Sequence, residues 1–207
     1  MKGKFIVIYG ANNFGKTLQA RILVDELRAA GITAAYLKYP IYELEPTGPR
    51  LEGILRKGDE KNLSPLERQK IFAQNRRDYE PTLFGRLELG EWVVAEDYRK
   101  TGIAWGITYG VDIWTMEKLN NGMYPEDLEI CLDGARFAQA IEENHLHEQS
   151  GLWDKNRAVY KVLALRYDWK VVDASKEVGQ VELPDLFWPI SIPRAIPEGG
   201  IIREINL

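Results

Sequence analysis

The sequence has very little cysteine: among 207 residues there is one, Cys131, within the apolar run LEICLD. A lone cysteine cannot form an intramolecular disulfide, which excludes the disulfide-rich scaffolds of small secreted domains. The apolar residues around it predict a buried, reduced thiol that packs in the core.

Long hydrophobic runs and a surplus of basic residues are also missing. The first apolar run, FIVIY at residues 5–9, is far shorter than the roughly 20 residues that span a bilayer, and no signal-peptide cleavage pattern follows it. The net charge of −4 argues against binding to nucleic acid polymers, which usually require a basic face. We therefore expect a cytoplasmic protein with no membrane or nucleic acid partner.

Short apolar runs recur along the chain, separated by longer segments of helical character. They lie at residues 5–9, 33–39, 91–97, 128–133 and 170–174. This alternation predicts an α/β fold in which a parallel five-stranded sheet is flanked by helices on both faces. No repeat or low-complexity tract divides the chain, so we expect one domain over residues 1–179. Prolines and paired glycines exclude a long helix from residues 180–207, which we expect to form a tail packed on the domain.

The clearest helix signal covers residues 64–79. Ser64 suits the N-cap, Pro65 suits the first turn, and Glu67 completes a capping box. Pro81 is then expected to end or kink the helix, because proline lacks the backbone N–H that the helix interior requires.

The stretch GANNFGKT lies between the first apolar run and a helical segment. It fits the pattern G-x-x-x-x-G-K-[ST], with Gly10, Gly15, Lys16 and Thr17 at the required positions. In such a loop, backbone N–H groups surround phosphate oxygens, the helix N-terminus adds its dipole, and the lysine neutralises the β- and γ-phosphates. A chance match at a strand-to-helix turn is the alternative. The motif predicts a P-loop NTPase-type fold with an ATP site made of Gly10, Ala11, Asn12, Asn13, Phe14, Gly15, Lys16, Thr17 and Leu18.

A magnesium ion bound with the phosphates would need oxygen ligands close to this loop. The Thr17 hydroxyl is one candidate, and the run WVVAED ends in the carboxylates of Glu96 and Asp97. Adjacent residues of a strand point to opposite faces, so the sequence leaves open which of the two carboxylates serves the metal. A solvated acidic loop is the other interpretation of this pair.

The order of these motifs resembles the thymidylate kinase family of nucleoside monophosphate kinases. The similarity covers residues 4–175 and includes KYP, FAQNRRDYEPTLFGRLELGEWVVAEDY, TGIAWG, PEDLEICLD and VVDA. The resemblance implies an enzyme that transfers the γ-phosphate of ATP, with Mg²⁺ as cofactor, to a nucleoside monophosphate, with dTMP as the leading acceptor. It also implies a homodimer.

The resemblance further implies a set of acceptor-binding residues. In that family an aromatic residue and an arginine four positions later hold the acceptor, and Phe72 and Arg76 match them on one face of the predicted helix. A core aromatic and a surface arginine are the alternatives for this pair. Tyr39 and Pro40 match the aromatic–proline pair that shapes the pocket, and Arg50 best matches the arginine that binds the acceptor phosphate. A plain surface arginine is the alternative for Arg50. The expected acceptor site is Tyr39, Pro40, Arg50, Phe72, Arg76, Tyr98 and Trp105.

The sequence departs from the family pattern around the transferring phosphate. The family's Asp-Arg-Tyr triplet is Glu96-Asp97-Tyr98 here, so its arginine is missing. One well-placed arginine contributes roughly 10³-fold or more to the rate of phosphoryl transfer. Arg99 and Lys100, directly after the triplet, are therefore candidates to replace it.

A flexible lid over the phosphates is expected near residues 142–157, where Arg157 matches a recurring family position. His145, His147 and Glu148 lie in the same segment, but their spacing does not place both imidazoles on one helix face, and we expect no separate zinc site. The expected catalytic residues are Lys16, Arg99, Lys100 and Arg157.

Two further functions remain open from the sequence. The altered triplet favours a deoxynucleoside kinase or a monophosphate kinase for another base, because it lies where donor and acceptor phosphates meet. The missing arginine favours a regulator that binds ATP without efficient transfer, although the intact Lys16 and Thr17 argue against it.

Overall fold

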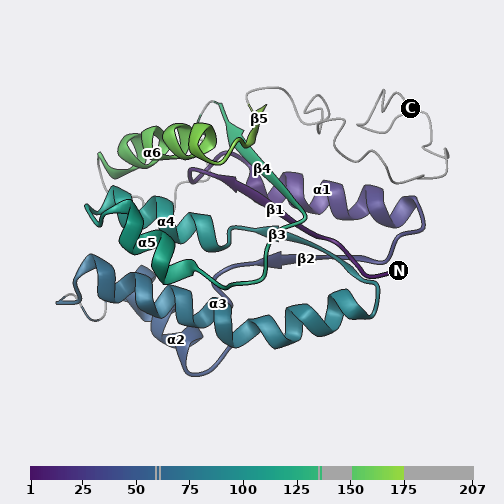
Figure 1. Cartoon of the computed structure of the whole chain (residues 1–207), viewed down its shortest axis with the longest axis horizontal. Coiled ribbons are helices and arrows are strands. Elements are labelled where there is room, and N and C mark those ends of the chain that lie inside the picture. The colour runs from purple at the N-terminus through teal and green to yellow at the C-terminus, as the bar shows by residue number, and fades with distance from the viewer. Residues whose placement is uncertain (59, 61, 135, 137–150, 175–207) are drawn as a thin grey trace.

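The computed structural model describes residues 1–58, 60, 62–134, 136 and 151–174. In this part of the chain, five parallel strands form one sheet in the order β2-β3-β1-β4-β5 (Figure 1). The strands are β1 (Phe5–Gly10), β2 (Ala34–Lys38), β3 (Trp92–Glu96), β4 (Leu128–Asp133) and β5 (Lys170–Asp173). The predicted α/β class is confirmed, and each strand coincides with one of the apolar runs.

Helices connect the strands and cover both faces of the sheet. They are α1 (Lys16–Ala29), α2 (Thr47–Glu52), the π-helix η1 (Gly53–Lys57), α3 (Pro65–Glu88), α4 (Arg99–Thr108), α5 (Ile113–Asn120) and α6 (Leu152–Arg166). Helix α1 packs against β1, β2 and β3, whereas α3, α4 and α6 pack against β3, β1 and β4. The connection from β1 to β2 runs toward the β2 edge of the sheet, whereas the later connections run toward the β5 edge. Because connections between parallel strands are right-handed, α1 lies on one face of the sheet and α3, α4 and α6 lie on the other (Figure 1).

The central strands are buried along their whole length. Phe5, Ile6, Val7 and Ile8 on β1 are each at most 1% exposed, as expected for parallel strands with helices on both faces. Cys131 on β4 is a buried free thiol, as predicted, and burial raises its pKa to about 12. The thiol is therefore protonated at neutral pH and serves as a core residue.

All five strands end at the same edge of the sheet because they are parallel. The register places Gly10 on β1 beside Leu132 on β4, and places Glu96 on β3 beside both Ile8 on β1 and Lys38 on β2. In open α/β sheets, ligands bind outside this carboxyl edge, where the loops that follow the strands gather.

Helix α3 begins as predicted and extends further than expected. The Ser64 hydroxyl accepts the Glu67 amide at 3.2 Å, and the Glu67 carboxylate accepts the Ser64 amide at 2.8 Å. The helix does not end at Pro81. Pro81 is exposed, so water can satisfy the carbonyl that the missing N–H leaves unpaired. The turns beyond it bury Leu83 and Leu87 completely, and this packing outweighs the local cost of the proline.

Replacing Ser64 with alanine should lower the free energy of unfolding by about 1 kcal/mol, because the substitution removes the N-cap acceptor of α3. Denaturant unfolding followed by circular dichroism would measure the change. Ser64→Thr keeps the hydroxyl, which accepts the Glu67 amide and donates to the Glu67 carboxylate at 2.6 Å, and should stay close to the unsubstituted protein. An equal loss of stability in both variants would contradict the capping role.

The predicted tail at residues 180–207 and residues 142–150 of the predicted lid, with His145, His147 and Glu148, lie outside the described residues. The division of the chain into domain, lid and tail therefore stays a prediction. Within the described part of the chain, no helix has both the length and the apolar character of a membrane span.

Candidate active site

A cavity of about 330 Å³ lies at the carboxyl edge of the sheet. Its walls come from the loop after β1, the segment after β2, the end of β3, and helices α3 and α4. The cavity is lined by Asn12, Asn13, Gly15, Lys16, Thr17, Leu18, Lys38, Tyr39, Pro40, Tyr42, Leu55, Arg56, Gln69, Phe72, Arg76, Glu96, Asp97, Thr101, Gly102 and Trp105. It thus joins the predicted phosphate-binding loop to most of the predicted acceptor residues, which lie far apart in the sequence.

The loop between β1 and α1 has backbone conformations that favour glycine. Gly10 has a φ of 140°, and a Cβ atom there would lie 2.6 Å from the carbonyl oxygen of Leu132. Gly15, the N-cap of α1, is left-handed, and Asn13 is a residue type that tolerates the same region. Helix α1 has no side-chain cap and no acidic residue in its first turn. Its N-terminal amides and its dipole are therefore suited to an anion.

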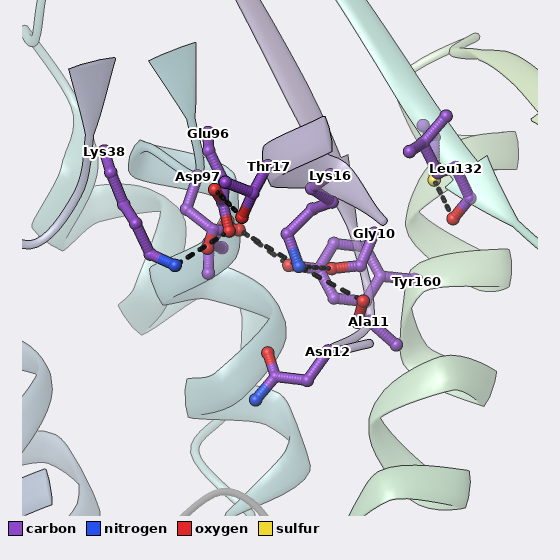
Figure 2. Close-up of polar contacts among 12 residues, drawn as sticks. Gly10, Ala11, Asn12, Lys16, Thr17, Lys38, Glu96, Asp97, Leu132 and Tyr160 are labelled. Carbon is purple, nitrogen blue, oxygen red and sulfur yellow. Dashed lines mark hydrogen bonds and ion pairs between the residues drawn. The ribbon is translucent and has the colours of Figure 1, made fainter. Parts of the chain in front are cut away.

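Lys16, the first residue of α1, is held against this loop (Figure 2). Its ammonium group donates to the carbonyl oxygens of Gly10 and Ala11 at 3.0 and 3.1 Å. The Asp97 carboxylate lies 3.8 Å from the same Nζ atom, and the lysine side chain is only 4% exposed. The positive charge of Lys16 is therefore fixed in position before any phosphate enters.

Glu96, the last residue of β3, is surrounded by three donors. Its Oε2 atom accepts the Thr17 hydroxyl at 2.6 Å, and the Lys38 ammonium lies 3.1 Å from Oε1 (Figure 2). The Tyr36 hydroxyl also donates to Oε2, at 2.7 Å. Burial alone would raise the pKa of Glu96, but the Lys16 and Lys38 cations and the two hydroxyl hydrogen bonds hold it below its usual value. Glu96 is therefore a carboxylate at neutral pH.

Asp97 follows the strand in a left-handed conformation, with a φ of 64°. This turn brings Asp97 and Glu96 to the same cavity, although successive residues of a regular strand would face opposite sides. The Thr101 hydroxyl donates to Asp97 Oδ1 at 2.9 Å. Burial raises the pKa of Asp97, and the Lys16 cation opposes that increase. Both carboxylates line the cavity, and Glu96 is the one in contact with Thr17.

The opposite wall contains one face of α3. Phe72 and Arg76 lie one turn apart and are 8% and 4% exposed. Arg76 donates from Nη1 to Asn120 Oδ1 at 3.2 Å, and burial lowers its pKa. Its Nε atom has no hydrogen-bond partner among the described residues. Gln69, one turn before Phe72, is buried, and its Oε1 atom has no partner in the part of the chain that the structure describes. Unpaired buried polar atoms are rare, so this face is suited to a ligand that supplies their partners.

Aromatic rings complete this side of the cavity. The Tyr39 ring lies 6.0 Å from that of Tyr79 and 5.1 Å from that of Tyr98, and Pro40 follows through a cis peptide bond. Trp105 on α4 is 3% exposed and lines the cavity. Tyr98 does not line the cavity, but its ring packs against that of Tyr39.

Three residues of the predicted ATP site lie outside the cavity lining. Gly10 and Ala11 supply the carbonyl groups that hold Lys16. Phe14 is buried and packs edge-on against Trp153, with ring centroids 5.5 Å apart. Their contribution is to the shape of the loop.

The structure does not bring Arg99 or Lys100 to the cavity. Arg99 forms an ion pair with the buried Glu126 carboxylate, and Lys100 forms one with Glu129 on β4. Neither cation is among the residues that line the cavity.

Arg50 and Arg157 also lie outside the cavity lining. Arg50 pairs with Glu60 at 2.6 Å on the surface, and Arg157 pairs with Asp133, at the end of β4, also at 2.6 Å. Their predicted roles therefore stay predictions.

The sequence did not identify several residues that line the cavity. They are Lys38, Tyr42, Leu55, Arg56, Gln69, Thr101 and Gly102. Two of them carried a signal: Lys38 directly precedes the Tyr39-Pro40 pair at the end of a strand, and Gln69 lies three positions before Phe72, on the same helix face. Arg56 gave no comparable signal.

Comparison with known proteins agrees with this geometry. The thymidylate kinase family model matches residues 8–183. The chain is 27% identical over 187 residues to the thymidylate kinase of Homo sapiens, covering 87% of this chain and 86% of that protein. It is 30% identical over 201 residues to the thymidylate kinase of Francisella tularensis subsp. holarctica, covering 88% and 93%. The solved structure of thymidylate kinase from Candida albicans has the same fold, with a TM-score of 0.67 at 20% identity over 83% of this chain and 84% of that one. The chain therefore belongs to the thymidylate kinase family and is a nucleoside monophosphate kinase.

Proposed function

We propose that this kinase transfers the γ-phosphoryl group of ATP to dTMP, forming ADP and dTDP, with Mg²⁺ as cofactor. The observation that carries the proposal is the continuous cavity that joins Lys16 to the wall containing Phe72 and Arg76. A donor and an acceptor bound at its two ends would have their phosphates near the end of β3. Phosphoryl transfer depends mainly on such alignment and on positive charge around the transferring group.

The donor end is the loop that precedes α1. The uncapped helix N-terminus suits phosphate oxygens, and Lys16 would neutralise the β- and γ-phosphates. Thr17, Glu96 and Asp97 offer oxygen ligands close to one another, a set that fits Mg²⁺, which takes few protein ligands beside phosphates and water. When bound, the metal would neutralise negative charge that develops on the phosphates.

The acceptor end suits a flat base. The Phe72 ring would stack on thymine, while Arg76 and Gln69 would hydrogen-bond the polar edge of the base. We place the acceptor phosphate near Arg56, which lines the cavity, rather than near Arg50, whose ion pair lies outside it.

We further propose a cytoplasmic homodimer, as the family resemblance implies. Size-exclusion chromatography with light scattering would measure the mass of the particle in solution. A monomer at all protein concentrations would contradict the dimer and leave the proposed reaction untouched.

Formation of ADP by the purified protein tests the reaction directly. Acceptors to compare are dTMP, dUMP, dCMP, dGMP and thymidine, each with ATP and Mg²⁺. We expect the fastest turnover with dTMP, and we expect it to stop when EDTA removes the metal. Thymidine as the better acceptor would indicate a deoxynucleoside kinase, which the presence of Asp97 in place of the family's arginine favours. Binding of ATP without turnover of any acceptor would indicate a nucleotide-binding regulator.

A further inference from the structure

The end of β3 brings two negative charges to the place where the phosphates would react. Glu96 and Asp97 both line the cavity, and every bound phosphate group adds further negative charge. Phosphoryl transfer is accelerated by positive charge fixed around the transferring group. Lys16 supplies one such charge from the donor side, and the wall formed by the strand ends needs another.

Lys38 lies on that wall. It is the last residue of β2 and pairs in register with Glu96, the last residue of β3, so both side chains leave the same face of the sheet. The Lys38 ammonium lies 3.1 Å from Glu96 Oε1, and 47% of the lysine side chain is exposed. Figure 2 shows it extending toward Glu96 and Asp97 from the side opposite Lys16.

The two cations at the start of α4 form ion pairs with other residues. Arg99 is paired with Glu126, whose side chain is fully buried, and Lys100 is paired with Glu129. Moving Arg99 toward the phosphates would leave a buried carboxylate without its partner, at a large cost in free energy.

The ion pair between Lys38 and Glu96 can open at a much lower cost. Glu96 keeps its hydrogen bonds from the Thr17 and Tyr36 hydroxyls when the ammonium leaves. Water reaches the lysine side of the ion pair and weakens the attraction between the two charges. The four-carbon stem of Lys38 is also flexible. Burial lowers the pKa of Lys38, but the Glu96 and Asp97 charges raise it overall, so the ammonium stays charged at neutral pH.

We propose that Lys38 is a catalytic residue, which leaves Glu96 and donates hydrogen bonds to the non-bridging oxygens of the transferring phosphoryl group. This role rests on the proposed function. In the reaction, an oxygen of the acceptor phosphate forms a bond to the γ-phosphorus, the bond from that phosphorus to the β,γ-bridging oxygen breaks, and ADP leaves with the electron pair. Lys38 remains protonated throughout and acts through its positive charge and its hydrogen bonds.

Three variants test the role of Lys38. Lys38→Met removes the positive charge, and Lys38→Arg keeps it. Lys4→Met is the matched control: Lys4 is 46% exposed and pairs with Asp127 at 2.8 Å, at the opposite edge of the sheet. With ATP and dTMP, kcat of Lys38→Met should be about 10²-fold lower, with both KM values within about threefold of the unsubstituted enzyme. The kcat of Lys38→Arg should be about tenfold higher than that of Lys38→Met, and the kcat of Lys4→Met should equal that of the unsubstituted enzyme.

Binding gives a second measurement that does not depend on turnover. ADP, Mg²⁺ and aluminium fluoride together mimic the transferring phosphoryl group, and calorimetry can compare dTMP affinity with and without the fluoride complex. Lys38→Met should lose most of the gain in dTMP affinity that aluminium fluoride produces, while its affinity for dTMP alone stays the same.

Three results would overturn this role. If the unsubstituted enzyme phosphorylates dTMP and Lys38→Met has the kcat of Lys4→Met, the role of Lys38 fails and the proposed function stands. A raised KM with unchanged kcat would make Lys38 a residue of uniform substrate binding instead. If the unsubstituted protein phosphorylates no acceptor, the proposed function fails, and the role of Lys38 fails with it.

Discussion

Replacing Lys16 with methionine is expected to lower kcat/KM for dTMP phosphorylation by about 10³-fold or more, on the order of 4 kcal/mol of transition-state stabilisation. The ammonium group is held by the carbonyl oxygens of Gly10 and Ala11 at 3.0 and 3.1 Å, so its charge is preorganised beside the N-terminus of α1. Because little reorganisation is needed when phosphate arrives, most of its electrostatic interaction contributes to the reaction. Steady-state kinetics in both substrates would measure the effect.

The stability of the same variant needs its own control. Lys16 lies 3.8 Å from Asp97, whose side chain is only 16% exposed. Methionine therefore leaves a partly buried carboxylate with less compensating charge and should lower the melting temperature. Adding Asp97→Asn removes that charge and should restore the melting temperature without restoring activity. Lys16→Met with kcat/KM within about fivefold of the unsubstituted enzyme would remove the lysine from the reaction, since even one lost oxyanion donor costs more.

The loop and the strands could be predicted because their signals are local. A parallel strand buried on both faces is a continuous apolar run, as β4 (Leu128–Asp133) shows, and the glycine positions of GANNFGKT carry their own backbone geometry. The end of α3 could not be predicted in this way. Pro81 is a strong local stop signal, yet Leu83 and Leu87 bury their side chains beyond it, and only the tertiary structure reveals that packing.

Charged side chains near the phosphates were harder to place than backbone elements. Arg99 and Lys100 were candidates to replace the missing arginine because they directly follow the altered triplet. Their side chains instead pair with Glu126 and Glu129, which lie 27 and 29 residues further along the chain. Lys38 is in the cavity because β2 and β3 are neighbours in register, although Glu96 lies 58 positions further along the sequence. Such long-range pairings depend on the sheet order, which periodicity and spacing do not encode.

Arg76→Met is expected to separate acceptor binding from stability. The kcat/KM for dTMP should fall about 10³-fold, because a site built around a hydrogen-bonding group loses much of its affinity when that group is removed. The melting temperature should stay the same or rise. Arg76 is 4% exposed and, among the described residues, makes one hydrogen bond, to Asn120, and no ion pair with a carboxylate. Burying a cation without a carboxylate partner is costly, so an apolar side chain of similar length removes that cost.

Gly102→Ala offers a second route to the same guanidinium group. A Cβ atom at Gly102 would lie 2.8 Å from Nη2 and 2.9 Å from Nη1 of Arg76, so the arginine would have to move. The KM for dTMP should rise about tenfold with a smaller change in kcat, since a displaced binding group weakens the acceptor complex. Gly85→Ala on α3 is the control. Apart from its chain neighbours and the backbone of its own helix, no atom of the described residues lies within 4 Å of the added methyl group, and the acceptor KM should not change.

The opposite pattern would assign Arg76 a different role. A large drop in melting temperature with an unchanged acceptor KM would mean that the hydrogen bond to Asn120, which joins α3 to α5, is the function of the guanidinium group. We expect instead that acceptor binding is lost while stability is retained or increased. That result would show that the buried Arg76 charge destabilises the fold but positions the guanidinium group for the acceptor. Thermal unfolding with and without dTMP distinguishes the two roles. The acceptor should raise the melting temperature of the unsubstituted enzyme and have little effect on Arg76→Met.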